Sequence, residues 1–220
     1  MIKLVNLCKY YRVGQGVKTV LNNVNAHIKP GRNLGILGQN GAGKSSLLRL
    51  IGGAELPTSG HICRHGRVSW PIGFSGGFHG SLSGRENLRF ICRIYDACIN
   101  EITEFVEDFS ELGAYMDMPV NTYSSGMKAK LAFGLSMAIN FDYYLIDEIT
   151  AVGDANFKKK SKAEFERRKD HSTLLVVSHS ISTIREHCDI AAVLHKGDLL
   201  FYDDMEEAIT FYQALPATKH

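Results

Sequence analysis

The sequence lacks any apolar run close to the roughly 18 residues that a membrane-spanning helix requires. Residues 2–4, directly after Met1, already resemble a strand, so we expect neither a signal peptide nor a membrane span. None of the five cysteines forms a C-x-x-C pair, which indicates free thiols in a reducing cytosol rather than a disulfide framework. The net charge of only +2 argues against a highly basic nucleic-acid binder.

The composition, 45% apolar and 22% charged residues, is that of an ordinary globular protein. A chain of 220 residues can form one domain with a substantial core, with or without an inserted subdomain. Residues 2–36 have the pattern of an antiparallel β region, in which Val24, Ala26 and Ile28 alternate with polar neighbours. Residues 84–140 repeat apolar side chains at helical spacing instead. We therefore predict an α/β fold with a helical segment set inside it.

Four further elements are expected from local patterns. They are a strand over residues 62–72, a glycine-rich joint over 73–83, a hairpin over 191–202 and a closing helix over 205–215. The joint is expected to be functional, because long glycine-rich loops inside a compact domain often are.

Residues 38–45, Gly-Gln-Asn-Gly-Ala-Gly-Lys-Ser, fit the phosphate-binding pattern G-x-x-x-x-G-K-[ST]. A chance match in a glycine-rich turn is the alternative, but an apolar strand-like run precedes the motif and a helix-like run follows it, as a phosphate loop requires. Backbone N–H groups and the positive end of the helix dipole would face the phosphates. Lys44 is expected to reach the β- and γ-phosphates, and the Ser45 hydroxyl to ligate Mg²⁺. The nucleotide-binding candidates of this segment are Gly38, Asn40, Gly41, Gly43, Lys44, Ser45 and Ser46.

Two carboxylates end an apolar strand-like run that begins at Phe141. Paired acids at a buried strand tip are costly unless a cation is present, and Mg²⁺ with a nucleotide is the simplest one beside a phosphate loop. Asp147 would then face the metal, and Glu148 would polarise an attacking water. His179 ends a second apolar run; it is either a structural histidine or, at the carboxyl edge of a parallel sheet, a functional one.

Several other patterns each allow two interpretations. Tyr11 either stacks on an adenine ring or packs at a strand edge. Ser124, Ser125 and Gly126 start a helix; such a start also forms an anion site, but physical reasoning alone favours a helix cap. Phe90 is either an exposed contact or the edge of the core.

For the remaining candidates the sequence favours ordinary surface positions over functional sites. His61, Cys63 and His65 could suggest a metal cluster, but nothing with ligand spacing follows them, which favours a solvated strand or turn. The charge runs at 158–160 and 167–169 are expected on solvated helix faces, with contact to an anionic headgroup or acidic partner as the alternative.

Taken together, the order of these motifs resembles the ATPase subunits of ABC transporters over almost the whole chain. The resemblance implies a P-loop NTPase (RecA-like) core with an N-terminal antiparallel β region and an inserted helical subdomain at about 84–140. Residues 1–220 would then form a single ABC nucleotide-binding domain. Residues 38–45 are similar to the Walker A motif, 143–148 to Walker B, and 123–127, Tyr-Ser-Ser-Gly-Met, to the signature motif.

The same resemblance assigns further roles. Asp154 lies in a segment similar to the D-loop, His179 corresponds to the switch histidine, and Tyr11 lies where the family has its adenine-stacking aromatic. Ser125 and Gly126 would contact the nucleotide of a second subunit. Glu148, His179 and Lys44 are then the catalytic candidates, and ATP and Mg²⁺ the expected cofactors.

The form of the signature and the segments 70–73, 76–87 and 150–154 are similar to the polysaccharide-exporter branch, most of all to the KpsT-type ATPases that power capsular polysaccharide export. Exporters of O-antigen or teichoic acid share much of this but often carry an added C-terminal domain, and the end of the chain at His220 favours the capsule interpretation. A soluble ABC ATPase acting on ribosomes or DNA, and a P-loop kinase or GTPase, are the competing classes.

One feature departs from the family. The joint normally offers a glutamine to Mg²⁺, and no glutamine lies between Gln39 and Gln213, so Ser75 and His79 are the nearest polar candidates. A single ATPase half implies a homodimer with two equivalent sites. The resemblance further implies a separate membrane-spanning permease subunit, further envelope export proteins, no nucleic-acid partner, and a location at the cytoplasmic face of the inner membrane.

Overall fold

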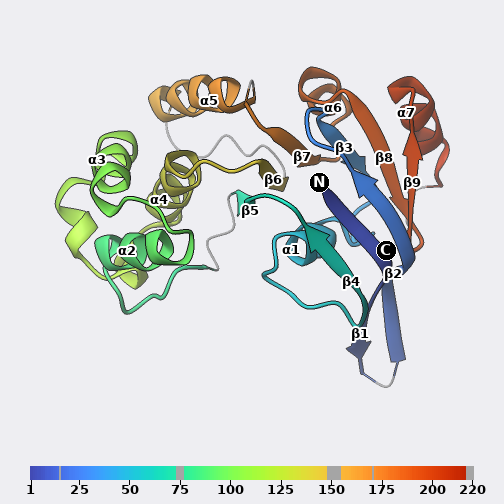
Figure 1. Ribbon diagram of the computed structural model, residues 1–220, viewed down its shortest axis with the longest axis horizontal. Helices are drawn as coiled ribbons and strands as arrows, with labels where there is room; N and C mark the ends of the chain where they lie inside the picture. The colour runs from blue at the N-terminus through green and yellow to red at the C-terminus, as the bar shows by residue number, and fades with distance from the viewer. Residues whose placement is uncertain (15, 73–76, 148–154, 170, 217–220) are drawn as a thin grey trace. The chain divides into compact units, whose positions relative to one another are not determined.

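The computed structural model describes residues 1–14, 16–72, 77–147, 155–169 and 171–216 (Figure 1). These residues fall into two compact units. The described residues of Met1–Pro71, Phe141–Ile149 and Ser172–His220 form the first unit, and those of Ile72–Asn140 and Thr150–His171 form the second. The two ends of the chain therefore fold together, and the middle of the chain folds as a separate unit.

The first unit contains a six-stranded sheet in the order β5-β6-β7-β3-β8-β9 (Figure 1). The pairs β6-β7, β7-β3 and β3-β8 are parallel, and β8 and β9 form the predicted hairpin. Every residue of β3 and β7 is buried, because a parallel strand is covered on both faces, and this explains their uninterrupted apolar sequences. The strands are β3 (Leu34–Leu37), β5 (Val68–Ile72), β6 (Tyr143–Asp147), β7 (Thr173–Val177), β8 (Ile190–His195) and β9 (Asp198–Tyr202).

A second, three-stranded sheet in the same unit consists of β1 (Ile2–Val13) between β2 (Gly16–Ile28) and β4 (Ser59–Arg64). Both pairings are antiparallel. Val24, Ala26 and Ile28 are buried and the residues between them are exposed, so the predicted alternation is confirmed.

The strand structure predicted for residues 62–72 is present but is interrupted by a turn. The segment forms two strands, β4 and β5, which belong to different sheets. Gly66 turns the chain between them at a φ of 115°, and the Arg67 backbone N–H donates to the Asp142 carboxylate at 2.6 Å. A Cβ on Gly66 would lie 2.8 Å from the same carboxylate, so both the conformation and the space require glycine.

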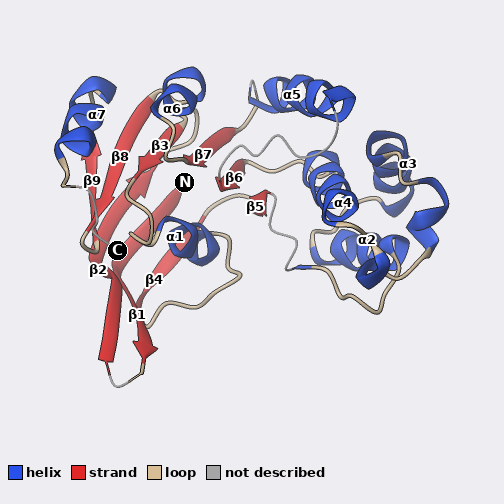
Figure 2. Ribbon diagram, turned by 180° about the vertical axis from the view of Figure 1, so that it is seen from behind, coloured by secondary structure: helices blue, strands red, loops and turns tan. Residues whose placement is uncertain are grey.

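Helix α1 (Lys44–Ile51) lies in the hydrophobic core that joins the two sheets (Figure 2). Leu47, Leu48, Leu50 and Ile51 are all 0% exposed, whereas Ser45 and Arg49 are half-buried, so most of the helix surface is covered. On the other face of the six-stranded sheet lies α6 (Ile181–His187), where a Cβ added to Gly35 would come within 2.5 Å of Ile184. The closing helix α7 (Met205–Ala214) is confirmed and packs on β8 and β9.

The second unit is helical, as predicted for residues 84–140. It contains α2 (Gly84–Ile94), α3 (Ile99–Ser110), α4 (Ser125–Ala138) and α5 (Ala155–Lys169), with 3-10 turns at Gly113–Asp117 and Val120–Thr122. Ser83 and Glu86 form a capping box that starts α2. Stacked rings of Phe105, Phe109 and Phe133 pack between the helices, and Phe157 of α5 meets them edge-on. Phe90 is 54% exposed, which favours the exposed contact over the core edge.

The basic runs of α5 include side chains with partners inside the second unit. Lys160 Nζ donates to the Asp108 carbonyl at 2.7 Å, and the Arg168 guanidinium pairs with Glu164 at 3.1 Å. Arg167 is exposed, with 68% of its side chain accessible. Among the described residues no helix is long and apolar enough to cross a membrane.

Candidate functional site

The loop between β3 and α1 has the shape that its glycines predict. Gly41 and Gly43 take positive φ angles of 75° and 108°, which non-glycine residues rarely adopt. Gly43 also packs directly on β2, where an added Cβ would lie 2.2 Å from Val20 Cγ1. Gly38 is equally confined, since its Cβ would lie 2.8 Å from the Leu194 carbonyl. The loop therefore requires glycine at 43 for both its backbone conformation and its packing on β2, and at 38 for its close approach to β8.

Lys44 begins α1, and its ammonium group lies inside the curve of the loop. The side chain is 8% exposed, and Nζ donates to the carbonyls of Gly38 at 2.6 Å and Gln39 at 3.1 Å. The first N–H groups of a helix have no intrahelical acceptors, and Gly43, as the N-cap, contributes no side-chain cap. The loop thus combines a buried cation with a helix N-terminus, which together suit a phosphate chain.

The carboxyl ends of three neighbouring strands meet beside this loop. In the sheet register Ile36 pairs with Val177, and Val177 pairs with Asp147. Asp147 is half-buried, while His179 is exposed two residues beyond the end of β7. The sheet therefore places Asp147, His179 and the start of the loop at one edge, as the sequence predicted for parallel strands.

The residues of this edge fit a magnesium nucleotide. The loop supplies backbone donors and an ammonium group, the half-buried Ser45 is the second residue of α1, and Asp147 adds a carboxylate. Hydroxyl and carboxylate oxygens are the ligand types that Mg²⁺ takes. Three sequence candidates, Glu148, Asp154 and Ser75, lie outside the described residues.

Tyr11 is anchored rather than loose. Its hydroxyl donates to Glu55 Oε1 at 2.6 Å and lies 3.2 Å from Ser46 Oγ. The Lys9 ammonium lies 5.1 Å from the centroid of its ring. The side chain is half-buried, and its stacking role stays a prediction. Ser46, a predicted nucleotide ligand, is buried and also accepts a hydrogen bond from Arg49 at 3.1 Å.

Sequence reasoning missed two residues at this site. Glu55, in the segment after α1, joins Tyr11 to two basic side chains. Lys18 lies directly across β1-β2 from Tyr11, and its Nζ is 3.7 Å from where a Cβ on Gly41 would be. Neither position belongs to a local motif, so the sequence offers no signal for them beyond their charge.

The helix start at 124–127 is a cap, as physical reasoning favoured. Ser124 Oγ accepts from the Met127 backbone N–H at 3.2 Å, and Ser125 is the first, exposed residue of α4. An added Cβ on Gly126 would meet only Ser124 Oγ, at 3.9 Å. Local packing therefore does not require glycine at 126. An open position of this kind is compatible with close approach of another molecule to the backbone of residue 126. Tyr123 is buried, with its hydroxyl on the Tyr115 carbonyl at 2.5 Å.

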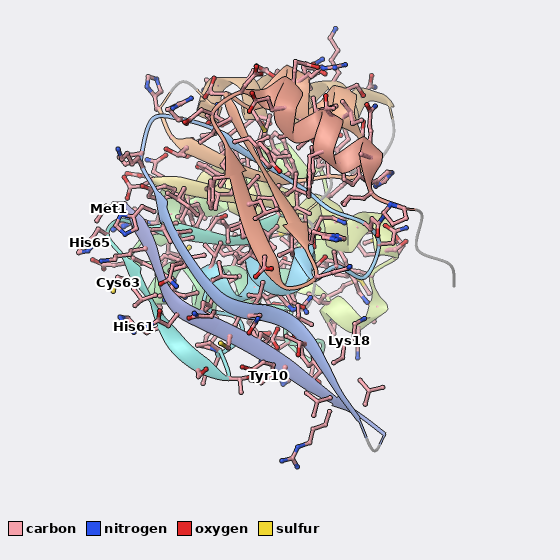
Figure 3. All side chains as sticks on the ribbon, turned by 90° about the vertical axis from the view of Figure 1, so that its right-hand side faces the viewer. Met1, Tyr10, Lys18, His61, Cys63 and His65 are labelled. Atoms are coloured by element: carbon pink, nitrogen blue, oxygen red, sulfur yellow. The ribbon has the colours of Figure 1, made fainter. Side chains whose placement is uncertain are left out.

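The other candidates behave as follows. The His79 side chain is exposed, and its backbone is held by the Asn87 amide, with hydrogen bonds of 2.8 and 3.1 Å. His61 and Cys63 lie in β4, an edge strand of the small sheet, and His65 directly follows it (Figure 3). In the part of the chain that the structure describes, no three histidine, cysteine or acidic side chains form a possible metal site. The solvated-strand interpretation is therefore favoured.

Comparison with known proteins adds an independent line of evidence. The family model described as ABC transporter matches residues 21–151. The chain is 54% identical over 97% of its length to the polysialic acid transport ATP-binding protein KpsT of Escherichia coli, covering 99% of that protein. It is 53% identical over 98% of its length to the capsule polysaccharide export ATP-binding protein CtrD of Neisseria meningitidis serogroup B, covering all of it.

Solved structures show the same fold. An ATP-binding cassette solved as a dimer in a post-hydrolysis state, bound to ADP and Pi, matches 90% of this chain and 96% of its own. The TM-score is 0.73 at 23% identity, so this likeness concerns the fold. The predicted α/β P-loop fold, with its antiparallel N-terminal sheet and helical region, is confirmed.

Proposed function

Because the chain belongs to the ABC transporter family, we propose that it is the ATP-binding and ATP-hydrolysing subunit of a capsular polysaccharide exporter. The observation that carries the proposal is the identity of 53–54% to proteins named for polysialic acid transport and capsule polysaccharide export, over nearly the full length of each chain. The loop at 38–45 and the strand edge beside it support the proposal, because a buried ammonium group, a helix N-terminus and a carboxylate suit a magnesium nucleotide.

In this proposal the loop and Lys44 bind the phosphate chain of ATP, and Ser45 and Asp147 hold Mg²⁺. The bound metal ion would offset the charge that develops on the phosphate oxygens. Glu148 orients or deprotonates the attacking water, and His179 holds the γ-phosphate and that water. Tyr11 stacks on the adenine.

Two copies of the chain would complete each other. Ser125 and Gly126 of one subunit cap the ATP bound by its partner, with Asp154 at the same interface. ATP closes this homodimer, and hydrolysis with release of phosphate reopens it. The glycine-rich joint and the helices after it pass the motion to a separate membrane-spanning permease at the inner membrane. Further envelope export proteins would then join the complex.

The decisive experiment compares cells whose only copy carries Lys44→Ala with cells that carry Lys29→Ala. Lys29 is an exposed lysine outside the loop, so it controls for the loss of a positive charge. Surface and cytoplasmic polysaccharide are measured separately. Polymer that is absent from the surface and accumulates inside only in Lys44→Ala supports export, whereas unchanged surface polymer excludes it.

Hydrolysis is tested in the purified protein. Glu148→Gln is expected to bind ATP but to hydrolyse it at least about 100-fold more slowly, the usual scale for the loss of a positioned base. Turnover near the wild-type rate in this variant would contradict the role given to Glu148.

A further inference from the structure

Glu55 is the centre of an ionic cluster around the Tyr11 hydroxyl. Its carboxylate accepts from Tyr11 at 2.6 Å, Lys9 at 2.8 Å and Arg49 at 3.1 Å. The Glu55 side chain is 20% exposed and that of Lys9 13%, so these contacts are largely shielded from water. Hydrogen bonds to charged groups are shorter and stronger than neutral ones.

The cluster connects the two halves of the expected nucleotide site. Tyr11 belongs to β1, whereas Ser46, Arg49 and Glu55 belong to α1 and the segment that follows it. Ser46 lies in the first turn of α1, directly after the phosphate loop, and its Oγ is 3.2 Å from the Tyr11 hydroxyl. Any shift of the ring therefore disturbs contacts made by the same helix that begins at the loop.

The orientation of the Tyr11 ring is fixed by this arrangement. A tyrosine side chain has two free torsions, and holding both the hydroxyl and one ring face leaves neither free. The Lys9 ammonium covers one face at 5.1 Å and is itself held by the Leu56 carbonyl at 2.8 Å. The proposed stacking on a planar base would use the opposite face of the ring. A ring held in its binding orientation avoids an ordering cost when the ligand arrives.

We propose that Glu55 is a positioning residue that orients Tyr11 for stacking on the base and couples base recognition to the phosphate loop through α1. This inference rests on the proposed ATP-binding function and deepens it. If Glu55 only held β1 against α1, its loss would weaken the binding of every ligand of the loop to the same extent. If it positions the ring, its loss weakens the binding only of ligands that carry a base.

The test compares two ligands of the purified full-length protein, Mg·ATP and Mg·tripolyphosphate, which has the phosphates without the base. Dissociation constants are measured for the wild type, Tyr11→Phe, Tyr11→Ala, Glu55→Ala and Glu55→Gln. The control is Glu104→Gln, an exposed acid on α3. Circular dichroism establishes that each variant is folded.

Glu55→Ala and Tyr11→Phe are each expected to weaken ATP binding about three- to tenfold, the scale of one hydrogen bond to a charged group, and tripolyphosphate binding less than about twofold. Glu55→Gln keeps a carbonyl acceptor and is expected to recover part of the loss. The double variant Tyr11→Phe with Glu55→Ala should bind ATP no more weakly than the poorer single variant, because both remove the same contact.

Three results overturn the inference in distinguishable ways. Equal weakening of both ligands in Glu55→Ala assigns Glu55 a purely structural role. Unchanged ATP binding in Glu55→Ala and Tyr11→Phe, with weakened binding in Tyr11→Ala, would mean that Tyr11 stacks on the base without help from Glu55. Unchanged ATP binding in Tyr11→Ala removes the stacking role itself, and a wild type that binds no ATP refutes the proposed function.

Discussion

The cluster around Glu55 also makes a prediction about stability. Burial alone would raise the pKa of the Glu55 carboxyl, but hydrogen bonds from Lys9, Tyr11 and Arg49 outweigh it and lower the pKa from 4.5 to about 2. A carboxyl whose pKa is lower in the folded state stabilises the fold above its unfolded pKa, and this contribution is lost as the pH falls towards the folded pKa.

The size of the effect follows from the two pKa values. The gap between 4.5 and about 2 corresponds to about 3 kcal/mol of stability at pH 7 and to about 2 kcal/mol at pH 3.5. Replacing Glu55 with glutamine removes this pH-dependent part. The free energy of unfolding of Glu55→Gln should therefore lie about 3 kcal/mol below that of the wild type at pH 7, with a smaller difference at pH 3.5.

Urea unfolding of both proteins at pH 7, 5, 4 and 3.5 measures the difference directly, because titrations elsewhere in the chain cancel in the comparison. Glu104→Gln, at an exposed position on α3, serves as the control and should change little at any pH. A difference between Glu55→Gln and the wild type that stays constant from pH 7 to pH 3.5 would refute the reasoning.

Three more predictions follow from local geometry. Gly43→Ala must take a φ of 108° and meet Val20 at 2.2 Å, so thermal unfolding should show a loss of at least about 2 kcal/mol; a smaller loss would mean that the loop relaxes freely. Ser83→Ala removes the capping box with Glu86 and should lower the free energy of unfolding in urea by about 1 kcal/mol; an unchanged free energy would show that the cap does not stabilise the protein. Lys18→Met should weaken ATP binding about threefold at low salt and less at high salt, and a salt-independent loss would exclude a charge contact.

Much of the fold is visible in the sequence because it depends on local patterns. The uninterrupted apolar runs of β3 and β7 record burial on both faces, and the spacing of Ser83 and Glu86 records a helix start. The division of residues 62–72 between two sheets is not visible in this way. It depends on a turn at Gly66 held by Asp142, a partner that lies 75 residues beyond Arg67.

In the candidate site, too, the residues that belong to local patterns were predictable and the others were not. The phosphate loop and Asp147 were predictable because a short motif or a single strand defines each of them. Glu55 was not, because one acid in an irregular segment has no pattern, and its partner Lys9 lies far earlier in the chain. Ser46 was expected among the nucleotide ligands, and only the fold reveals that its hydroxyl also joins the contacts around Tyr11.

The sheet order has a consequence for the making of the protein. β3, which leads into the phosphate loop, pairs with residues 175–177 on one side and 190–193 on the other. Ribosomes build chains from the N-terminus, so this strand has no neighbour in the sheet until synthesis has passed residue 177, and it lacks its second neighbour until synthesis has passed residue 193. A half-made chain therefore carries the whole phosphate-binding motif without the scaffold that shapes it. The strand that leads into the loop therefore gains its full support in the sheet only after residues 190–193 have been made.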